Sequence, residues 1–100
     1  MSKVVVLFEF AGMTHKEYDA ICGELKANNK LYNENRPSHV AFEKDGKWCV
    51  VDVWNSAEAM QEFAENDLLP AFQKIGLTPP QPVILPAHSY IGLAEDLISA

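Results

Sequence analysis

Asp52 is a carboxylate inside an otherwise apolar strand pattern, KWCVVDVWNS, at residues 47–56. A charged group in such a segment must face solvent, a charge partner or a functional site, because burying an unpaired carboxylate is costly. The preceding dipeptide Asp45-Gly46 is a strong signal for a two-residue hairpin turn. The register that this turn sets places His39 directly opposite Asp52, close enough for the two side chains to meet.

A histidine that faces a carboxylate has the form of a general base with an orienting acid. In this reading His39 exchanges a proton with a ligand, and Asp52 fixes the tautomer of the imidazole. His88 is expected at the same end of the sheet, as a second acid/base or a hydrogen-bond donor. The alternative is a structural cross-strand hydrogen bond that satisfies two polar groups.

The same three residues also have the ligand types of a facial metal triad, two histidines and one carboxylate. They come from three different strands and have no local ligand spacing, so we expect no metal. As an enzyme, the protein is expected to do proton-transfer chemistry without an organic cofactor. Cys22 and Cys49 form no CxxC pair, and we expect both to be reduced, buried thiols.

The surrounding pattern predicts the elements that must position these side chains. Thr14 and Glu17 stand in the S/T-x-x-E relation that begins a helix, and β-branched and aromatic runs indicate the strands. Asp67 resembles a fresh helix cap, with Pro70 in the first turn that follows. The expected elements are a strand at 3–11, a helix at 14–29, strands at 38–44 and 47–54, a helix from 55 or 56 with a further piece after 67, and a strand at 82–91.

This order predicts an α+β fold of the ferredoxin-like type, βαββαβ, in one domain covering residues 1–100. Its four-stranded antiparallel sheet has the strand order 4-1-3-2. The last nine residues, 92–100, are expected to form a short helix or a loose tail.

The two faces of the sheet receive different expected roles. Val40, Phe42 and Val51 of the hairpin, with the even-numbered apolar residues of the first strand, are expected to carry the helices. Val83 and Leu85 of the last strand are expected on that side too. The face of Asp52 is expected to be open and to contribute ligand-binding residues, namely Trp48, Val50, Trp54, Val5, Leu7 and Ile84.

A face as apolar as this one is rarely left in water. The simplest cover is the same face of a second subunit in a two-fold homodimer. Two such sheets would enclose a barrel, with an internal cleft for a small-molecule ligand.

Composition narrows the class of partner. The 100 residues carry a formal net charge of −6, and their eight Lys and Arg residues form no basic stripe. We therefore expect no nucleic-acid partner. The apolar run at the start is too short for a signal-peptide core, no stretch reaches the length of a membrane span, and a cytoplasmic location is expected.

One segment of the chain resembles a known family. VVDVWNSAEAMQEFAENDLLPAF, at residues 50–72, is similar to the strand–Trp–Ser–acid–Ala–helix stretch of the dimeric α/β-barrel superfamily, especially its antibiotic-biosynthesis-monooxygenase-like branch. Trp54 matches the tryptophan that ends the third strand in that family. The haem-degrading members use a histidine on the second helix, and the region from Ser56 to Gly76 contains none, so haem degradation is not expected.

The resemblance implies a homodimer that binds a small aromatic or carbonyl-containing molecule and works without a cofactor. A cofactor-free monooxygenase would use the His39–Asp52 base to deprotonate an aromatic substrate, which then meets oxygen itself, and an isomerase or cyclase would need the same base. The alternative is a non-catalytic ligand-binding or structural dimer of the same fold.

Overall fold

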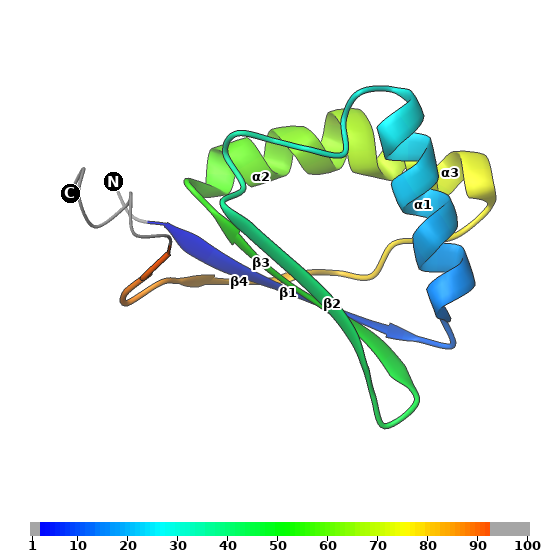
Figure 1. The fold of residues 1–100 in the computed structure, drawn as a ribbon, viewed down its shortest axis with the longest axis horizontal. Coiled ribbons are helices and arrows are strands. Elements are labelled where there is room, and N and C mark those ends of the chain that lie inside the picture. The colour runs from blue at the N-terminus through cyan, green and yellow to red at the C-terminus, as the bar shows by residue number, and fades with distance from the viewer. Residues whose placement is uncertain (1–2, 93–100) are drawn as a thin grey trace.

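The computed structural model describes residues 3–92, and the expected C-terminal tail lies almost wholly outside them. A four-stranded sheet forms one layer, and the helices form a second layer on one of its faces (Figure 1). The elements are β1 (Val4–Ala11), α1 (His15–Ala27), β2 (Ser38–Lys44), β3 (Lys47–Trp54), α2 (Ala57–Phe63), η1 (Ala64–Leu68), α3 (Leu69–Ile75) and β4 (Val83–Pro86).

The sheet has the order β2-β3-β1-β4 with antiparallel neighbours, which confirms the predicted ferredoxin-like arrangement. The hairpin turn is confirmed as well. Asp45 and Gly46 both have positive φ, 51° and 78°, as a two-residue turn of type I′ requires. His39 is therefore paired with Asp52 across β2 and β3, in the predicted register.

The predicted assignment of the two sheet faces is right for β1 and wrong for the hairpin and for β4. β1 pairs with β3 so that Val6 lies beside Asp52 and Phe8 beside Val50. Paired residues share a face, and Val6 and Phe8 belong to the buried core between sheet and helices. Asp52 therefore points toward the helices, and the face expected to be open is the covered one.

The opposite face is bare in Figure 1 and carries the hairpin and β4 residues that were expected to contact the helices, together with Val5 and Leu7 of β1. One cross-strand row crosses all four strands, and a second row beside it crosses the same strands. The first row is Val83, Leu7, Val51 and Val40, and the second is Leu85, Val5, Val53 and Ser38. Leu7, Val40, Val83 and Leu85 are among the exposed large hydrophobic residues of the described chain.

Helix α1 begins as its sequence predicts. The Thr14 side chain accepts a hydrogen bond from the Lys16 backbone and donates one to the Glu17 carboxylate. Ile21 and Leu25 belong to the apolar stripe Tyr18, Ile21, Cys22 and Leu25, which has the spacing i, i+3, i+4 and i+7, and both are buried in the core. The helix is therefore fixed with this stripe toward the sheet.

The second helical region is continuous, so the prediction that Asp67 caps a new helix is wrong. Ser56 caps α2, and Asp67 lies inside the π-helical turn η1, which joins α2 to α3. Pro70 follows directly, and an α-helix would bring its ring against a carbonyl four residues earlier. The wider turn, in which the Leu69 N–H donates to the Ala64 carbonyl, lets the helix pass this proline.

Candidate active site

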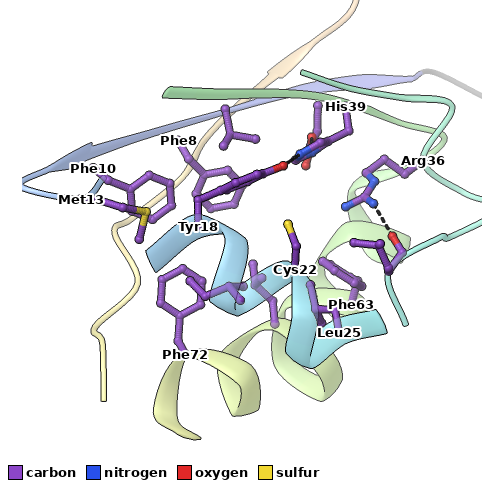
Figure 2. Close-up of a pocket in the computed structure, with 15 residues that line it drawn as sticks. Phe8, Phe10, Met13, Tyr18, Cys22, Leu25, Arg36, His39, Phe63 and Phe72 are labelled. Carbon is purple, nitrogen blue, oxygen red and sulfur yellow. Dashed lines mark hydrogen bonds and ion pairs between the residues drawn. The ribbon is translucent and has the colours of Figure 1, made fainter. Parts of the chain in front are cut away.

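Three side chains form a continuous hydrogen-bonded chain between helix α1 and the sheet (Figure 2). The Tyr18 hydroxyl lies 2.5 Å from His39 Nε2. On the other side of the ring, His39 Nδ1 lies 2.5 Å from Asp52 Oδ1. A carboxylate can only accept, so Nδ1 carries the proton, and Nε2 of a neutral imidazole then accepts from the tyrosine hydroxyl.

Asp52 is the buried charge among these three hydrogen-bonded side chains, with only 4% of its surface exposed. Its second oxygen accepts a hydrogen bond from Trp54 Nε1, at 3.4 Å. Both carboxylate oxygens therefore have a donor, which is the condition for tolerating a buried charge. The His39 side chain remains 29% exposed, so the chain runs from the interior toward the surface.

A small cavity of about 60 Å³ lies beside this chain, between the sheet and the helices. Its wall is mainly aromatic and aliphatic, with Phe8, Phe10, Phe63 and Phe72 among the aromatic residues (Figure 2). The polar and ionisable side chains in the wall are Tyr18, Cys22, Arg36, His39 and Asp52.

A larger groove of about 700 Å³ opens to solvent beside the cavity, along the loop between α1 and β2. The cavity and the groove share five lining residues, which form the partition between them. These residues are Tyr18, Cys22, Leu31, Arg36 and His39. Movement of this partition would join the two spaces.

Burial raises the pKa of the Tyr18 phenol above its ordinary value, and the neighbouring Cys22 thiol adds to the shift. Burial likewise raises the pKa of the Cys22 thiol, although the nearby Tyr18 hydroxyl opposes this. The positive charge of Arg36 acts against both shifts. Tyr18 therefore stays protonated near neutral pH and serves as the donor to His39.

These two raised pKa values predict a fall in stability at alkaline pH. A group whose pKa is higher in the folded state binds more protons there, so its contribution is complete below its unfolded pKa and declines above it. The ordinary values are 9.0 for Cys22 and 10.0 for Tyr18. Urea unfolding from about pH 8 to about pH 10 should show a decreasing free energy of unfolding, with a smaller decrease in Cys22→Ala. A flat profile in wild type would contradict the assignment.

The fold of the chain is similar to that of several solved structures. No protein-family model and no curated protein match the sequence. Among solved structures, a protein of unknown function from Nitrosomonas europaea is similar with a TM-score of 0.67 and 16% identity, over 94% of this chain and 97% of that one. SnoaB, a cofactor-independent oxygenase from Streptomyces nogalater, is similar with a TM-score of 0.64 and 15% identity, over 91% of this chain and 98% of its own.

A third structure, a putative antibiotic biosynthesis monooxygenase from Chloroflexus aurantiacus, has a TM-score of 0.63 and 13% identity, over 91% and 98% of the two chains. The chain has the ferredoxin-like fold of the antibiotic-biosynthesis-monooxygenase-like proteins. At these identities the likeness establishes the fold alone.

Of the predicted catalytic residues, His39 and Asp52 are brought together, and His88 is not. His88 is exposed and follows β4, which is the edge strand farthest from β2. It does not line the cavity beside His39. The expected convergence fails because two strands, β3 and β1, separate the edge strands of the sheet.

The predicted ligand-binding residues divide between the two faces. Val50 lines the cavity, and Trp54 lies behind it, donating to Asp52. Trp48 packs against Tyr18, with ring centroids 5.3 Å apart, and Ile84 packs against the core. The prediction that Val5 and Leu7 share the face of Asp52 is wrong, because β1 pairs with β3 through Val5–Val53 and Leu7–Val51.

Tyr18 and Arg36 are site residues that the sequence reasoning did not identify. Tyr18 belongs to the apolar stripe of α1, where an aromatic residue is expected as core, and only its hydroxyl distinguishes it. Arg36 lies in the connector before β2, where a charge is expected to be solvated. The available signal was that Arg36 is the only arginine of the chain.

Two further properties of the described residues bear on the class of site. Within residues 3–92, no group of three or more His, Cys, Asp or Glu side chains is arranged to hold a metal ion. Across the same residues, no helix has the length and apolar character needed to cross a membrane.

Proposed function

We propose that this protein binds a small aromatic or carbonyl-containing molecule between the sheet and the helices, and removes a proton from it through His39. The observation that carries the proposal is the chain Tyr18–His39–Asp52 at the wall of an apolar cavity. A base must reach the proton that it abstracts, and its orientation must be fixed by a partner. Asp52 supplies that partner, and the cavity supplies a place for the ligand.

The closed cavity is too small for an aromatic ligand. An engineered apolar cavity that accepts benzene measures about 150 Å³, whereas this one holds about 60 Å³. His39 Nε2 is also occupied by the Tyr18 hydroxyl. We therefore propose that Tyr18 swings away when a ligand enters from the groove, and that a ligand hydroxyl takes its place at Nε2.

The proton transfer from the ligand then needs only side chains of this protein. The ligand O–H or activated C–H bond breaks, the proton binds His39 Nε2, and the electron pair stays on the ligand. Asp52 stabilises the imidazolium that forms, and the released Tyr18 hydroxyl can donate to the ligand oxygen. In a monooxygenase-like reaction the resulting electron-rich anion would react with oxygen directly. The fold shared with SnoaB is consistent with this chemistry.

The alternative is a ligand-binding or structural protein in which the same hydrogen bonds only satisfy buried polar groups. The two readings predict different effects of replacing His39, either on the reaction rate or on stability alone. A base contributes about 100-fold to 10,000-fold to a rate, whereas a structural hydrogen bond contributes only to stability.

The experiment is oxygen uptake with a panel of hydroxylated aromatic compounds, measured for wild type, His39→Asn and the control His15→Asn. His15 is an exposed histidine on α1, so its variant carries the same substitution away from the cavity. We expect wild type and His15→Asn to consume oxygen with at least one compound, and His39→Asn to lose at least about 100-fold. Tryptophan fluorescence should show that His39→Asn still binds that compound.

Two outcomes of this experiment would contradict the proposal. Full turnover in His39→Asn would show that His39 is not the base. Binding without turnover in wild type would favour the non-catalytic reading.

We expect His88→Asn to match wild type in the same oxygen-uptake experiment, because His88 is exposed and does not line the cavity. A loss of turnover in His88→Asn would restore it as a second acid/base.

We also propose that the functional unit is a homodimer, with a second copy covering the bare face of the sheet. The two cross-strand rows described above present an apolar surface that is continuous across all four strands. A surface of this kind is rarely left in water, and a two-fold axis would place identical rows against each other. In this arrangement each subunit keeps its own cavity, on the side of the sheet away from the partner.

A further inference from the structure

We infer that Arg36 binds the negatively charged oxygen that forms on the ligand when His39 removes its proton, so that the ligand is a phenol or an enol held as its anion. This inference rests on the proposed function and names the chemical class of its ligand. It also assigns Arg36 as a residue that contacts the ligand.

The first support is the position of the guanidinium. Arg36 lines both the inner cavity and the outer groove, together with His39. Figure 2 shows the two side chains on the same side of the cavity. A ligand that enters through the groove to reach His39 therefore passes Arg36.

The second support is that Arg36 is held in place while only one of its guanidinium donors has a hydrogen-bond partner among residues 3–92. One terminal nitrogen donates to the Leu31 carbonyl at 2.6 Å. The guanidinium lies 5.7 Å from the ring centroid of Trp54 and 5.4 Å from that of Phe63. A guanidinium has five N–H donors, and the bond to Leu31 uses one of them. A positioned guanidinium of this kind suits an oxygen anion better than a flexible surface lysine does.

The third support is the balance of charge in the cavity. Before proton transfer the lining holds one negative charge, on Asp52, and one positive charge, on Arg36. After transfer the ligand is negative and His39 is positive, so the total is again zero. Without Arg36, the apolar cavity would carry a net negative charge both before and after the transfer, which burial disfavours.

The influence of Arg36 on acidic groups at this wall is already visible in two neighbours. Its positive charge lowers the pKa of Tyr18 and of Cys22, against the larger effect of burial. A ligand hydroxyl placed in the same cavity would experience the same charge, and an opposite charge a few ångströms away favours the ionised form.

The rival explanation is that Arg36 only anchors the loop before β2. Two substitutions separate the roles. Arg36→Lys keeps the positive charge, and Arg36→Gln keeps a polar side chain that can still donate to the Leu31 carbonyl. Lys30→Gln is the matched control, because it removes a positive charge from an exposed position in the same loop region.

The test uses para-nitrophenol, whose absorption spectrum distinguishes the phenol from the phenolate. The bound probe is titrated on each folded variant, as judged by circular dichroism. In wild type, Arg36→Lys and Lys30→Gln, the pKa of the bound probe should lie about one unit or more below that of the free probe. In Arg36→Gln it should return to the free value or rise above it, a change of at least about tenfold in the ratio of phenolate to phenol.

A second measurement does not depend on any variant folding. Arg36 is the chain's only arginine, so peptide mapping after modification by phenylglyoxal, which prefers arginine to other side chains, reports on this residue. Saturating para-nitrophenol should slow the modification at least about tenfold, as followed by mass spectrometry.

Failure of this inference is distinguishable from failure of the proposed base. Wild type that does not bind the probe, binds it with an unchanged or raised pKa, or is not protected from phenylglyoxal overturns the role of Arg36. The same holds if Arg36→Gln lowers the pKa of the probe as wild type does. Full turnover in His39→Asn overturns the base alone, since the equilibrium ionisation of the bound probe requires no transfer to His39.

Discussion

Replacing Asp52 with alanine is expected to lower the free energy of unfolding by about 3 kcal/mol. The carboxylate accepts from His39 Nδ1 and from Trp54 Nε1, and both donors would lose their acceptor. The Trp54 donor has no route to solvent, because this side chain is only 1% exposed. Urea unfolding at neutral pH measures the effect.

Asp52→Asn is the control for this substitution. Its amide has nearly the same shape and one acceptor oxygen, so it can keep one of the two bonds, and the expected loss is about 1 kcal/mol. An alanine variant as stable as wild type would mean that the carboxylate does not hold these donors. Asp52→Asn should nevertheless lose turnover, as His39→Asn does, because an amide cannot stabilise the imidazolium that forms on His39.

Replacing Leu7 with lysine is expected to convert the proposed dimer into a monomer. Leu7 lies on the central strand β1, in the row that crosses all four strands. In the dimer the lysine of each subunit would be buried in the interface, and an unpaired buried charge costs several kcal/mol. In the monomer the position is exposed, so the fold itself should be little affected.

Light scattering after size-exclusion chromatography tests this prediction. Wild type and Gln73→Lys, which adds the same charge at an exposed position on α3, should show twice the chain mass, and Leu7→Lys the chain mass alone. A monomeric wild type, or a Leu7→Lys variant that stays dimeric, would reject the proposed interface.

The sequence predicts local pairing well and the orientation of the sheet poorly. The Asp45-Gly46 turn determines which residues of β2 and β3 face each other, so the His39–Asp52 pair follows from local chemistry. Which face then turns toward the helices depends on the register between β1 and β3, which are distant in sequence. Both faces of the hairpin are apolar, so the alternation pattern cannot distinguish them.

The position of Asp52 added to this error. An acid suggests the face away from the helices, but its two donors, His39 and Trp54, satisfy it inside. Tyr18 was hidden for the opposite reason, because its ring follows the core stripe while its hydroxyl belongs to the site. The contact that decides the case of Tyr18 joins a helix to a strand, through two residues that are 21 positions apart in the chain.

The π-helical turn at Ala64–Leu68 has a consequence for the shape of the cavity. A turn of this kind corresponds to one extra residue within an α-helix, and each residue advances the helix by about 100°. Phe63, before the turn, lines the cavity. Leu68, in the turn, and Phe72, after it, line the same cavity. Loss of a single residue between them would rotate one set of side chains away from the sheet. The number of residues in this helical segment therefore determines which of its side chains form the wall of the cavity that a ligand must contact.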